Sequence, residues 1–240
     1  MKKIIITAGG TSEKIDNVRK ITNSSSGKLG MTIANQFLKN FPDVEIIYIC
    51  SKNSVRPDDS SVRIVEIEGT YDLEKQVHNL LVNEKIDGFI HSMAVSDYTT
   101  NFVTSIDRIK ESISKYEDLD DAFNNIDPLG GTKISSSEKD LVIFLKPTPK
   151  IISMIKKLSP STYLVGFKLL DNVPKETLID VAKKLRDKNK CNLVVANDLN
   201  NIRNGEHIGY IIDQNENIAE AHGKEDIAKR IVERMTQIWK

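Results

Sequence analysis

The sequence lacks the features that mark several protein classes. It has only two cysteines, one tryptophan and 6% aromatic residues, and Lys+Arg and Asp+Glu both number 34, so neither sign of charge is in excess. Nucleic-acid-binding proteins usually carry a basic excess or stripe, so this balance gives no support for that class. No apolar run approaches the ~18 residues of a membrane span, and no secretory signal precedes the first apolar run. We therefore expect a soluble, cytoplasmic protein with neither a nucleic-acid nor a membrane partner.

The few cysteines and histidines give no sign of a metal site. Cys50 and Cys191 lie in apolar, strand-like segments without metal-site spacing, and the four histidines are scattered. We interpret the cysteines as buried thiols in a reducing cytosol. A chain of 240 residues with 39% hydrophobic content can bury a substantial core as a single domain.

The first thirty residues contain the most informative local pattern. A β-branched run at 4–6 is followed by Gly-Gly-Thr at 9–11, which predicts a strand that enters a tight turn. Serines at 24–26 and Gly27 precede apolar residues with helical spacing. Serine hydroxyls can cap the free N–H groups of a helix start, and with Lys28 nearby such a start suits a phosphate. The stretch predicts either an anion or nucleotide site at the carboxyl edge of a sheet, or an ordinary strand, turn and capped helix.

Strands and helices alternate along the rest of the chain. The predicted strands are 44–49, 63–67, 86–91, 141–145, 163–167 and 193–196, with helical spacing between most of them. This order favours an α/β fold, a Rossmann-like three-layer sandwich with a mostly parallel sheet. Segments 208–212 and 218–221 flank a polar turn and predict a C-terminal β-hairpin. Pro149 predicts a helix start with Thr148 as its N-cap.

Residues 99–132 differ from their surroundings. They are polar, carry more acid than base and end in Pro-Leu-Gly-Gly. A segment this long without a strong period is usually either disordered or a functional lid. Because a strongly apolar strand follows at 141–145, we expect a flap over about 99–140 within a single domain of 1–240.

Several motifs, taken in order, resemble those of phosphopantothenoylcysteine synthetases. The matching positions are Gly-Gly-Thr at 9–11, Asp16, Val18-Arg19, Asn23, Ser25 to Lys28, Gly30, Ala-Val-x-Asp-Tyr at 94–98, Thr-Lys-Ile at 132–134, 145–149, Ile151, Gly166-Phe167, Lys184, Lys188 and Ala-Asn-Asp at 196–198. One departure is the flap motif, usually Lys-Ile-Lys-Lys, which reads Lys-Ile-Ser-Ser here. The later lysine is therefore missing.

The resemblance implies a ligase of coenzyme A biosynthesis. Such enzymes join 4′-phosphopantothenate to L-cysteine through an acyl-nucleotide, made from CTP in bacterial members, whereas eukaryotic members favour ATP. The expected partners are thus 4′-phosphopantothenate, L-cysteine, CTP and Mg²⁺. The family forms homodimers in which each subunit helps complete its neighbour's site, so we expect a homodimer.

The resemblance also implies roles for individual residues. Asn23 would act in turnover of the acyl-nucleotide, and Lys133 would be the flap cation. By its own chemistry, a carboxylate at a strand's carboxyl end such as Asp97 could hold Mg²⁺ through the nucleotide's phosphates or accept from the nucleotide itself, and the resemblance implies that it belongs to the nucleotide site. The implied nucleotide-binding residues are Gly9, Gly10, Thr11, Ser25, Ser26, Gly27, Lys28, Ala94, Asp97, Phe167, Lys184 and Lys188. From the residues alone simpler roles stay open, namely helix capping for Asn23 and Asp97, core packing for Phe167 and solvation for the lysines.

Two other functional classes stay open. One is a Rossmann-like NAD(P)-binding reductase. Two observations count against it: the Gly-x-Gly-x-x-Gly motif is missing, and no acid is suitably placed to bind a ribose 2′-OH. The other is a non-catalytic nucleotide-binding protein, which predicts nucleotide binding that survives Asn23→Ala with no activity to lose.

Overall fold

An eight-stranded sheet forms the centre of the computed structural model, which describes residues 1–239. The spatial order is β12-β11-β10-β9-β6-β1-β4-β5. The strands are β1 Lys3–Ala8, β4 Glu45–Ser51, β5 Arg63–Ile67, β6 Gly88–His91, β9 Tyr163–Leu170, β10 Leu193–Asp198, β11 Ile208–Asp213 and β12 Ile218–His222. In this spatial order the six strands β10, β9, β6, β1, β4 and β5 pair in parallel with their neighbours. β11 and β12 add an antiparallel hairpin at one edge. The parallel part has the 3-2-1-4-5-6 order of doubly wound folds, so the predicted fold class is confirmed.

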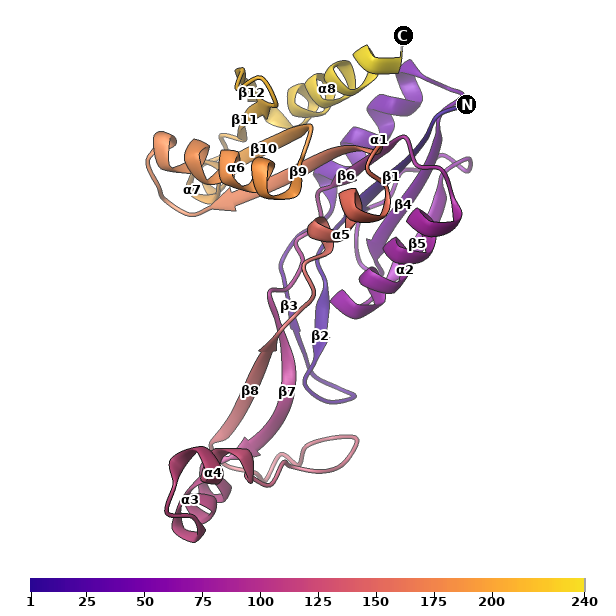
Figure 1. Cartoon of the computed structure of the whole chain (residues 1–240). Coiled ribbons are helices and arrows are strands. Elements are labelled where there is room, and N and C mark those ends of the chain that lie inside the picture. Colours follow the sequence, from indigo (N-terminus) through magenta and orange to yellow (C-terminus); the bar gives the residue numbers. More distant parts are fainter. Residues whose placement is uncertain (240) are drawn as a thin grey trace.

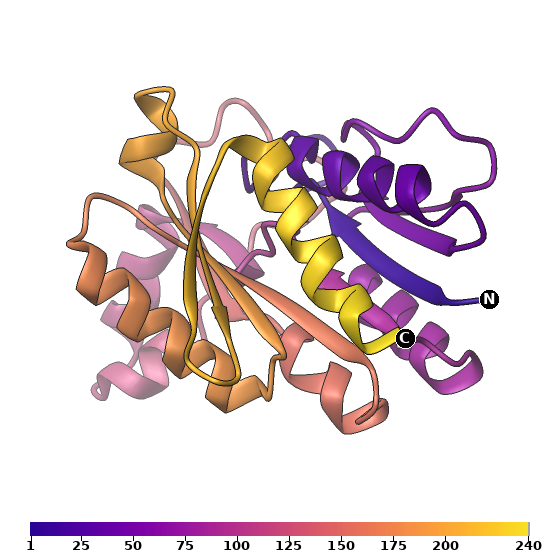
Figure 2. The same ribbon diagram turned by 90° about the horizontal axis from the view of Figure 1, so that it is seen from above.

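Helices cover both faces of this sheet (Figures 1 and 2). α1 (Lys28–Asn40) and α8 (Gly223–Thr236) pack on one face, and α2 (Thr70–Asn83), α5 (Ile151–Leu158) and α6 (Lys175–Asn189) pack on the other. Side chains of a strand alternate between faces. Ile4 and Ile6 of β1 accordingly join the core under α1 and α8, whereas Ile5 joins the other core. The alternating apolar side chains of the strands and the apolar faces of the helices thus form two hydrophobic cores, one on each face of the sheet.

A long arm projects from the body, as Figure 1 shows. Its stem is the antiparallel pair β7 (Tyr98–Ser105) and β8 (Leu141–Pro147), and α3 (Ile106–Lys115) and α4 (Leu119–Asn124) lie at its far end. Phe102 and Phe144 stack across the stem with ring centroids 4.5 Å apart. The segment expected to form a flap makes up most of this arm, and it contains two short helices that the sequence analysis did not predict.

The start of α5 differs from its prediction. The helix begins at Ile151 with Lys150 as N-cap, so the prediction of Thr148 as N-cap is wrong. The hydroxyl of Thr148 donates instead to the backbone oxygen of Ser96, and its N–H donates to the backbone oxygen of Asp97 at 3.0 Å. Thr148 is therefore used to join two loops rather than to cap a helix.

The start of α1 also differs, because no serine is its N-cap. The N-cap is Gly27, whose φ of 78° lies in the left-handed region that glycine tolerates, and no side chain caps the helix there. Ser26 Oγ accepts from the N–H of Lys28 at 3.4 Å, which is long for a hydrogen bond. The serine cap considered from the sequence is therefore limited to this one long contact, and a glycine occupies the N-cap position.

A small hairpin, β2 (Ser12–Lys14) and β3 (Lys20–Thr22), escaped the sequence analysis. Glu13 on β2 is buried, and its Oε1 accepts from the N–H of Thr70 at 2.9 Å and from the hydroxyl of Thr70 at 2.8 Å. These groups belong to the first residue of α2. A carboxylate at a helix N-terminus is stabilising, so Glu13 caps α2 from a distant strand.

Two smaller elements and the cysteines complete the description. α7 (Leu199–Arg203) follows β10, and a 3₁₀ turn at Gln237–Trp239 follows α8. Cys50 and Cys191 are buried free thiols, as predicted. Among the helices of residues 1–239, none is both long and apolar enough to cross a bilayer.

We expect Glu13→Ala to lower the free energy of unfolding by about 2–3 kcal/mol, because it leaves the N–H of Thr70 buried without an acceptor and leaves the Thr70 hydroxyl only its 3.4 Å contact with Thr11 Oγ1. Chemical denaturation measures this change. Glu138→Ala is the matched control, since Glu138 is exposed on the arm. Equal stability of the two variants would contradict the capping role of Glu13.

Candidate functional site

A large cavity opens at the carboxyl edge of the parallel sheet. Its volume is about 950 Å³, and its wall includes the start of α1, the loop after β6 and the ends of β9 and β10. In doubly wound folds the ligand crevice lies where the strand order reverses, which here is between β1 and β6. The cavity therefore occupies the position at which this fold binds ligands.

The wall of the large cavity is strongly basic, although the whole chain has a formal net charge of zero. Its charged residues are one aspartate, Asp97, and six lysines: Lys28, Lys150, Lys157, Lys168, Lys188 and Lys224. Only Lys28 and Lys188 were predicted as site residues. The other four come from α5 with its N-cap (Lys157 and Lys150), β9 (Lys168) and α8 (Lys224), and the fold brings these three elements together. This segregation of charge suits an anionic ligand.

Most of the predicted nucleotide-binding residues line this cavity. They are Ser25, Ser26, Gly27, Lys28, Ala94, Asp97, Phe167 and Lys188. Phe167 also packs against the core beneath α8, so both roles considered for its ring are open to it. Gly9, Thr11 and Lys184 are not among the lining residues of either cavity described here. Gly9 and Thr11 are buried behind the wall, and Lys184 is exposed on α6.

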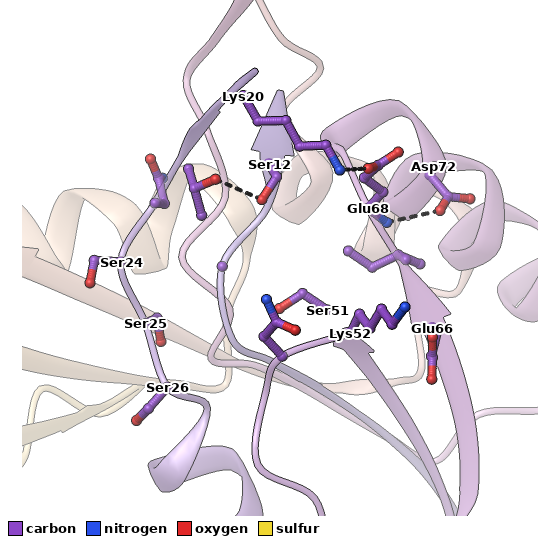
Figure 3. A pocket seen from close by; sticks show the side chains of 15 residues that line it. Ser12, Lys20, Ser24, Ser25, Ser26, Ser51, Lys52, Glu66, Glu68 and Asp72 are labelled. Carbon is purple, nitrogen blue, oxygen red and sulfur yellow. Dashed lines mark hydrogen bonds and ion pairs between the residues drawn. The ribbon is translucent and has the colours of Figure 1, made fainter. Parts of the chain in front are cut away.

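A second cavity of about 720 Å³ shares the serines at 24–26 with the first. Figure 3 shows these serines along one side and carboxylates along the other. The charged lining residues are Lys20, Lys52, Glu66, Glu68 and Asp72. The Lys20 ammonium pairs with the Glu68 carboxylate, and Asp72 accepts from the N–H of Glu68. This cavity is therefore of mixed charge, in contrast to the first.

Asn23 lies in the second cavity, next to the shared serines. Its N–H donates to the backbone oxygen of Thr11 at 3.1 Å. Within residues 1–239 its side chain makes no hydrogen bond, and the N-cap of α1 is Gly27, so Asn23 does not cap that helix. A Cβ on Gly10 would lie 1.9 Å from the backbone oxygen of Asn23, so glycine is required there. These contacts fix the backbone of Asn23 at the wall of the second cavity, and its side-chain amide is available to a ligand.

Asp97 is exposed and forms an ion pair with Lys150. No group of three or more potential metal ligands occurs among the described residues. Mg²⁺ is commonly bound by one or two carboxylates together with substrate phosphates and water. A single carboxylate at this wall fits a Mg²⁺ ion that arrives bound to a nucleotide. To bind that ion, the Asp97 carboxylate has to give up its ion pair with Lys150.

Lys133 lies away from both cavities, exposed on the arm loop. The tip of the β2–β3 hairpin holds this loop. Asp16 Oδ2 accepts from the N–H of Ile134 at 3.1 Å, and Arg19 donates to the backbone oxygen of Ile134. Burial alone would raise the pKa of Asp16, but hydrogen bonds from the N–H groups of Val18, Arg19 and Ile134 hold it below its usual range.

His91, at the end of β6, was not predicted as a site residue, yet it lines the large cavity. Its Nδ1 lies 2.9 Å from Thr7 Oγ1. Burial lowers the pKa of His91 to about 4, so the ring is neutral near pH 7. In the sequence, only its position at the carboxyl end of a predicted strand could have indicated that His91 is a site residue, because it belongs to none of the motifs.

Comparison with known proteins adds a family to this geometry. The family model for the DNA/pantothenate metabolism flavoprotein C-terminal domain matches residues 1–120 and 125–238. A coenzyme A biosynthesis bifunctional protein, CoaBC of Thermococcus kodakarensis, is 36% identical over 198 residues, which cover 82% of this chain and 41% of that protein. CoaBC of Methanocaldococcus jannaschii is 27% identical over 99% of this chain and 51% of its own length. The chain thus spans about half or less of these curated relatives.

Solved structures agree with this assignment. The crystal structure of the DNA/pantothenate metabolism flavoprotein from Streptococcus pneumoniae has 36% sequence identity and a TM-score of 0.85, with 100% of both chains covered. A mutant of Cab2 in complex with phosphopantothenate-cysteine shares the fold at 18% identity, with a TM-score of 0.66 over 98% of this chain and 87% of that one.

The neutral state of His91 predicts a pH effect on stability. Its pKa is lower in the folded than in the unfolded chain, so its contribution is complete above about pH 6.5 and is lost as the pH falls toward 4. Between about pH 7 and pH 5, the wild type should lose about 2 kcal/mol more of its free energy of unfolding than His91→Gln does. Urea denaturation at both pH values measures this difference. The exposed His222→Gln is the control, and the same pH slope in wild type and His91→Gln would refute the prediction.

Proposed function

The chain belongs to the family of the DNA/pantothenate metabolism flavoprotein C-terminal domain, as its motifs indicated, and from this premise we propose that it ligates 4′-phosphopantothenate to L-cysteine with CTP. The product would be 4′-phosphopantothenoylcysteine, an intermediate of coenzyme A biosynthesis. The basic wall of the large cavity is the observation that carries this proposal, because CTP and phosphopantothenate are both anionic. The buried free thiols suit a reducing cytoplasm.

The reaction has two steps, because a carboxylate has no usable leaving group. A carboxylate oxygen of phosphopantothenate attacks the α-phosphorus of CTP, and the bond from that phosphorus to the bridging oxygen breaks to release pyrophosphate. The neutral amine of cysteine then attacks the acyl carbon of the acyl-cytidylate. The carbon–oxygen bond breaks, CMP leaves with the electron pair, and the amine loses a proton.

The residues of the two cavities can serve both steps. Lys28 and the N–H groups at the start of α1 lie where phosphate oxygens can be bound. Mg²⁺, with Asp97 as its protein ligand, would offset phosphate charge when bound. Asn23 lines the second cavity next to the serines that both cavities share, so its amide can donate to the oxyanion that forms on the acyl carbon. The mixed charge of the second cavity suits the ammonium and carboxylate groups of cysteine.

The reductase alternative receives less support. In dinucleotide-binding folds an acid following the second strand of the sheet binds the ribose. The corresponding strand here is β4, which ends at Ser51 and is followed by Lys52.

The arm supports the proposal of a homodimer. A two-stranded ribbon is only marginally stable by itself in water, and this arm exposes apolar side chains at its far end. Leu119 is 60% exposed, Phe123 45% and Ile113 42%. A second copy would cover them, and it would also give Lys133, which is remote from its own chain's cavities, a site to complete.

We expect Asn23→Ala to reduce turnover by about 100- to 1,000-fold, since one oxyanion donor is worth roughly 3–4 kcal/mol. Pyrophosphate should still be released in a single turnover, and the acyl-cytidylate should accumulate without cysteine-dependent CMP release. Quenched-flow analysis of CTP, CMP and pyrophosphate measures both effects. Asn79→Ala is the control, because Asn79 is exposed on α2 and lines neither cavity. Normal turnover in Asn23→Ala would overturn the assigned role, and wild-type protein that releases no pyrophosphate with CTP or ATP would overturn the ligase.

A shared site predicts complementation between two inactive variants. When Asn23→Ala and Lys133→Ala are mixed after dissociation, half of the dimers are mixed, and each of these contains one intact site. The mixture should therefore regain about a quarter of wild-type activity. Sedimentation should give twice the chain mass of 27.0 kDa for each protein. If both variants dimerise and exchange subunits but the mixture stays inactive, Lys133 does not act in the partner's site.

A further inference from the structure

The arm loop, residues 130–137, has one point of attachment beyond its own arm, which is the tip of the β2–β3 hairpin. Of residues 130–140, only Ile134 is buried. Every hydrogen bond that joins the arm loop to another part of the described chain ends on Asp16, Asn17 or Arg19. The position of the loop therefore depends on three residues of the hairpin tip.

The Asp16 carboxylate is the centre of this attachment, and only 2% of its side-chain surface is exposed. Its Oδ1 accepts from the N–H groups of Val18 at 2.8 Å and Arg19 at 2.7 Å, which closes the hairpin turn. Its Oδ2 accepts from the N–H of Ile134 at 3.1 Å and lies 3.1 Å from Nε of Arg19. One oxygen thus holds the turn, and the other holds the arm loop.

The hairpin tip fixes the backbone on both sides of Lys133. Before the lysine, the backbone oxygen of Thr132 accepts from the N–H of Asn17 at 3.0 Å. After it, the backbone oxygen of Ile134 accepts from the guanidinium of Arg19. The Lys133 side chain itself is exposed and lines neither cavity. These contacts form a latch that holds the lysine's backbone and leaves its side chain accessible.

The latch and Asn23 lie at opposite ends of the same strand. β3 runs from Lys20 to Thr22, so Arg19 precedes it at the latch and Asn23 follows it at the wall of the second cavity. The hairpin can therefore hold the arm loop at one end without contact between the loop and the asparagine at the other.

We propose that Asp16 is a positioning residue, which latches the arm loop so that Lys133 is presented to the site that it serves. This inference rests on the proposed function, in which that site belongs to the partner subunit and the lysine offsets phosphate charge as pyrophosphate leaves. A loop with a single buried side chain would otherwise sample many positions, and a misplaced group loses much of its effect on the rate. Asp16 thus acts through Lys133 and does not touch the substrate.

Asp16→Asn separates the two oxygens of the carboxylate. The amide keeps one acceptor for the turn, but its NH₂ group faces the N–H of Ile134 and the guanidinium of Arg19, which are also donors. In a single turnover this variant should release pyrophosphate about 10- to 100-fold more slowly than wild type. Asp59→Asn is the matched control, because Asp59 accepts from the N–H of Ser61 at 2.9 Å in an exposed turn and lines neither cavity. Equal rates in all three proteins would overturn the proposal.

A double-mutant cycle distinguishes positioning of Lys133 from a general loss of structure. If Asp16 acts only through the lysine, Asp16→Asn should slow pyrophosphate release far less in a Lys133→Ala background than in wild type. Ile134→Ala weakens the latch from the loop side, so it should give the same non-additivity. Effects that multiply in the double variants would show a structural role and overturn the proposal.

Mixed dimers show which site Asp16 serves. When Asn23→Ala and Lys133→Ala chains are mixed, the intact site takes its lysine from the first chain and its asparagine from the second. Asp16→Asn added to the chain that lends the lysine should lower the regained activity about tenfold or more. Added to the chain that lends the asparagine, it should leave that activity within about twofold. The reverse result would assign Asp16 to Asn23 and overturn the proposal.

Amide hydrogen exchange tests the latch without turnover, which keeps this inference distinct from the ligase itself. Because the N–H of Ile134 is donated to Asp16, peptides covering residues 130–137 should exchange about tenfold faster in Asp16→Asn than in wild type or Asp59→Asn. If wild-type protein releases no pyrophosphate, the proposed function fails, and faster exchange in Asp16→Asn still shows that this carboxylate holds the loop. Unchanged exchange would overturn the latch even in an active ligase.

Discussion

The buried hydroxyl of Thr11 is the contact on which the geometry of both cavities depends. Its Oγ1 donates to Ser96 Oγ and accepts from the N–H of Ser96, both at 2.9 Å, while its backbone oxygen accepts from the N–H of Asn23. The backbone oxygen of Ser96 in turn accepts from the hydroxyl of Thr148, directly after the arm. One residue thus joins the loops after β1 and β6, the asparagine assigned to the chemistry and the base of the arm. Such a buried network is rigid, because each lost partner leaves a polar atom unsatisfied.

Local segregation of charge gives an overall neutral chain a site for anions. Lysines gather on the wall of the large cavity, whereas several acids are placed on the far side of the serines at 24–26. The two cavities meet at these serines, so an anionic ligand and a zwitterionic one can approach the same wall from opposite sides. The ligase proposal depends on this division, which the net charge does not reveal.

The arm is positioned by the β2–β3 hairpin as well as by its own stem. The side chains of Asp16 and Arg19 at the hairpin tip form hydrogen bonds with the backbone of Ile134. The N–H of Asn17 donates to the backbone oxygen of Thr132 at 3.0 Å. The loop that carries Lys133 is therefore held between these contacts, at a place set by the hairpin. This explains why a lysine assigned to catalysis lies outside its own chain's cavities, and why a shared site is the natural form of the proposal.

The sequence by itself determined the parallel α/β core, the C-terminal hairpin and the order of the motifs, because β-branched runs, helical spacing and turn residues act over a few neighbouring positions. It also placed Asn23 and Lys28 at the carboxyl edge, since they follow the first strand and open the first helix. Only the tertiary structure decided that Lys150, Lys168 and Lys224 share one wall, that Thr148 joins loops instead of capping a helix, and that Glu13 caps α2. Those roles arise from contacts between residues far apart in the chain, and local patterns carry no information about such contacts.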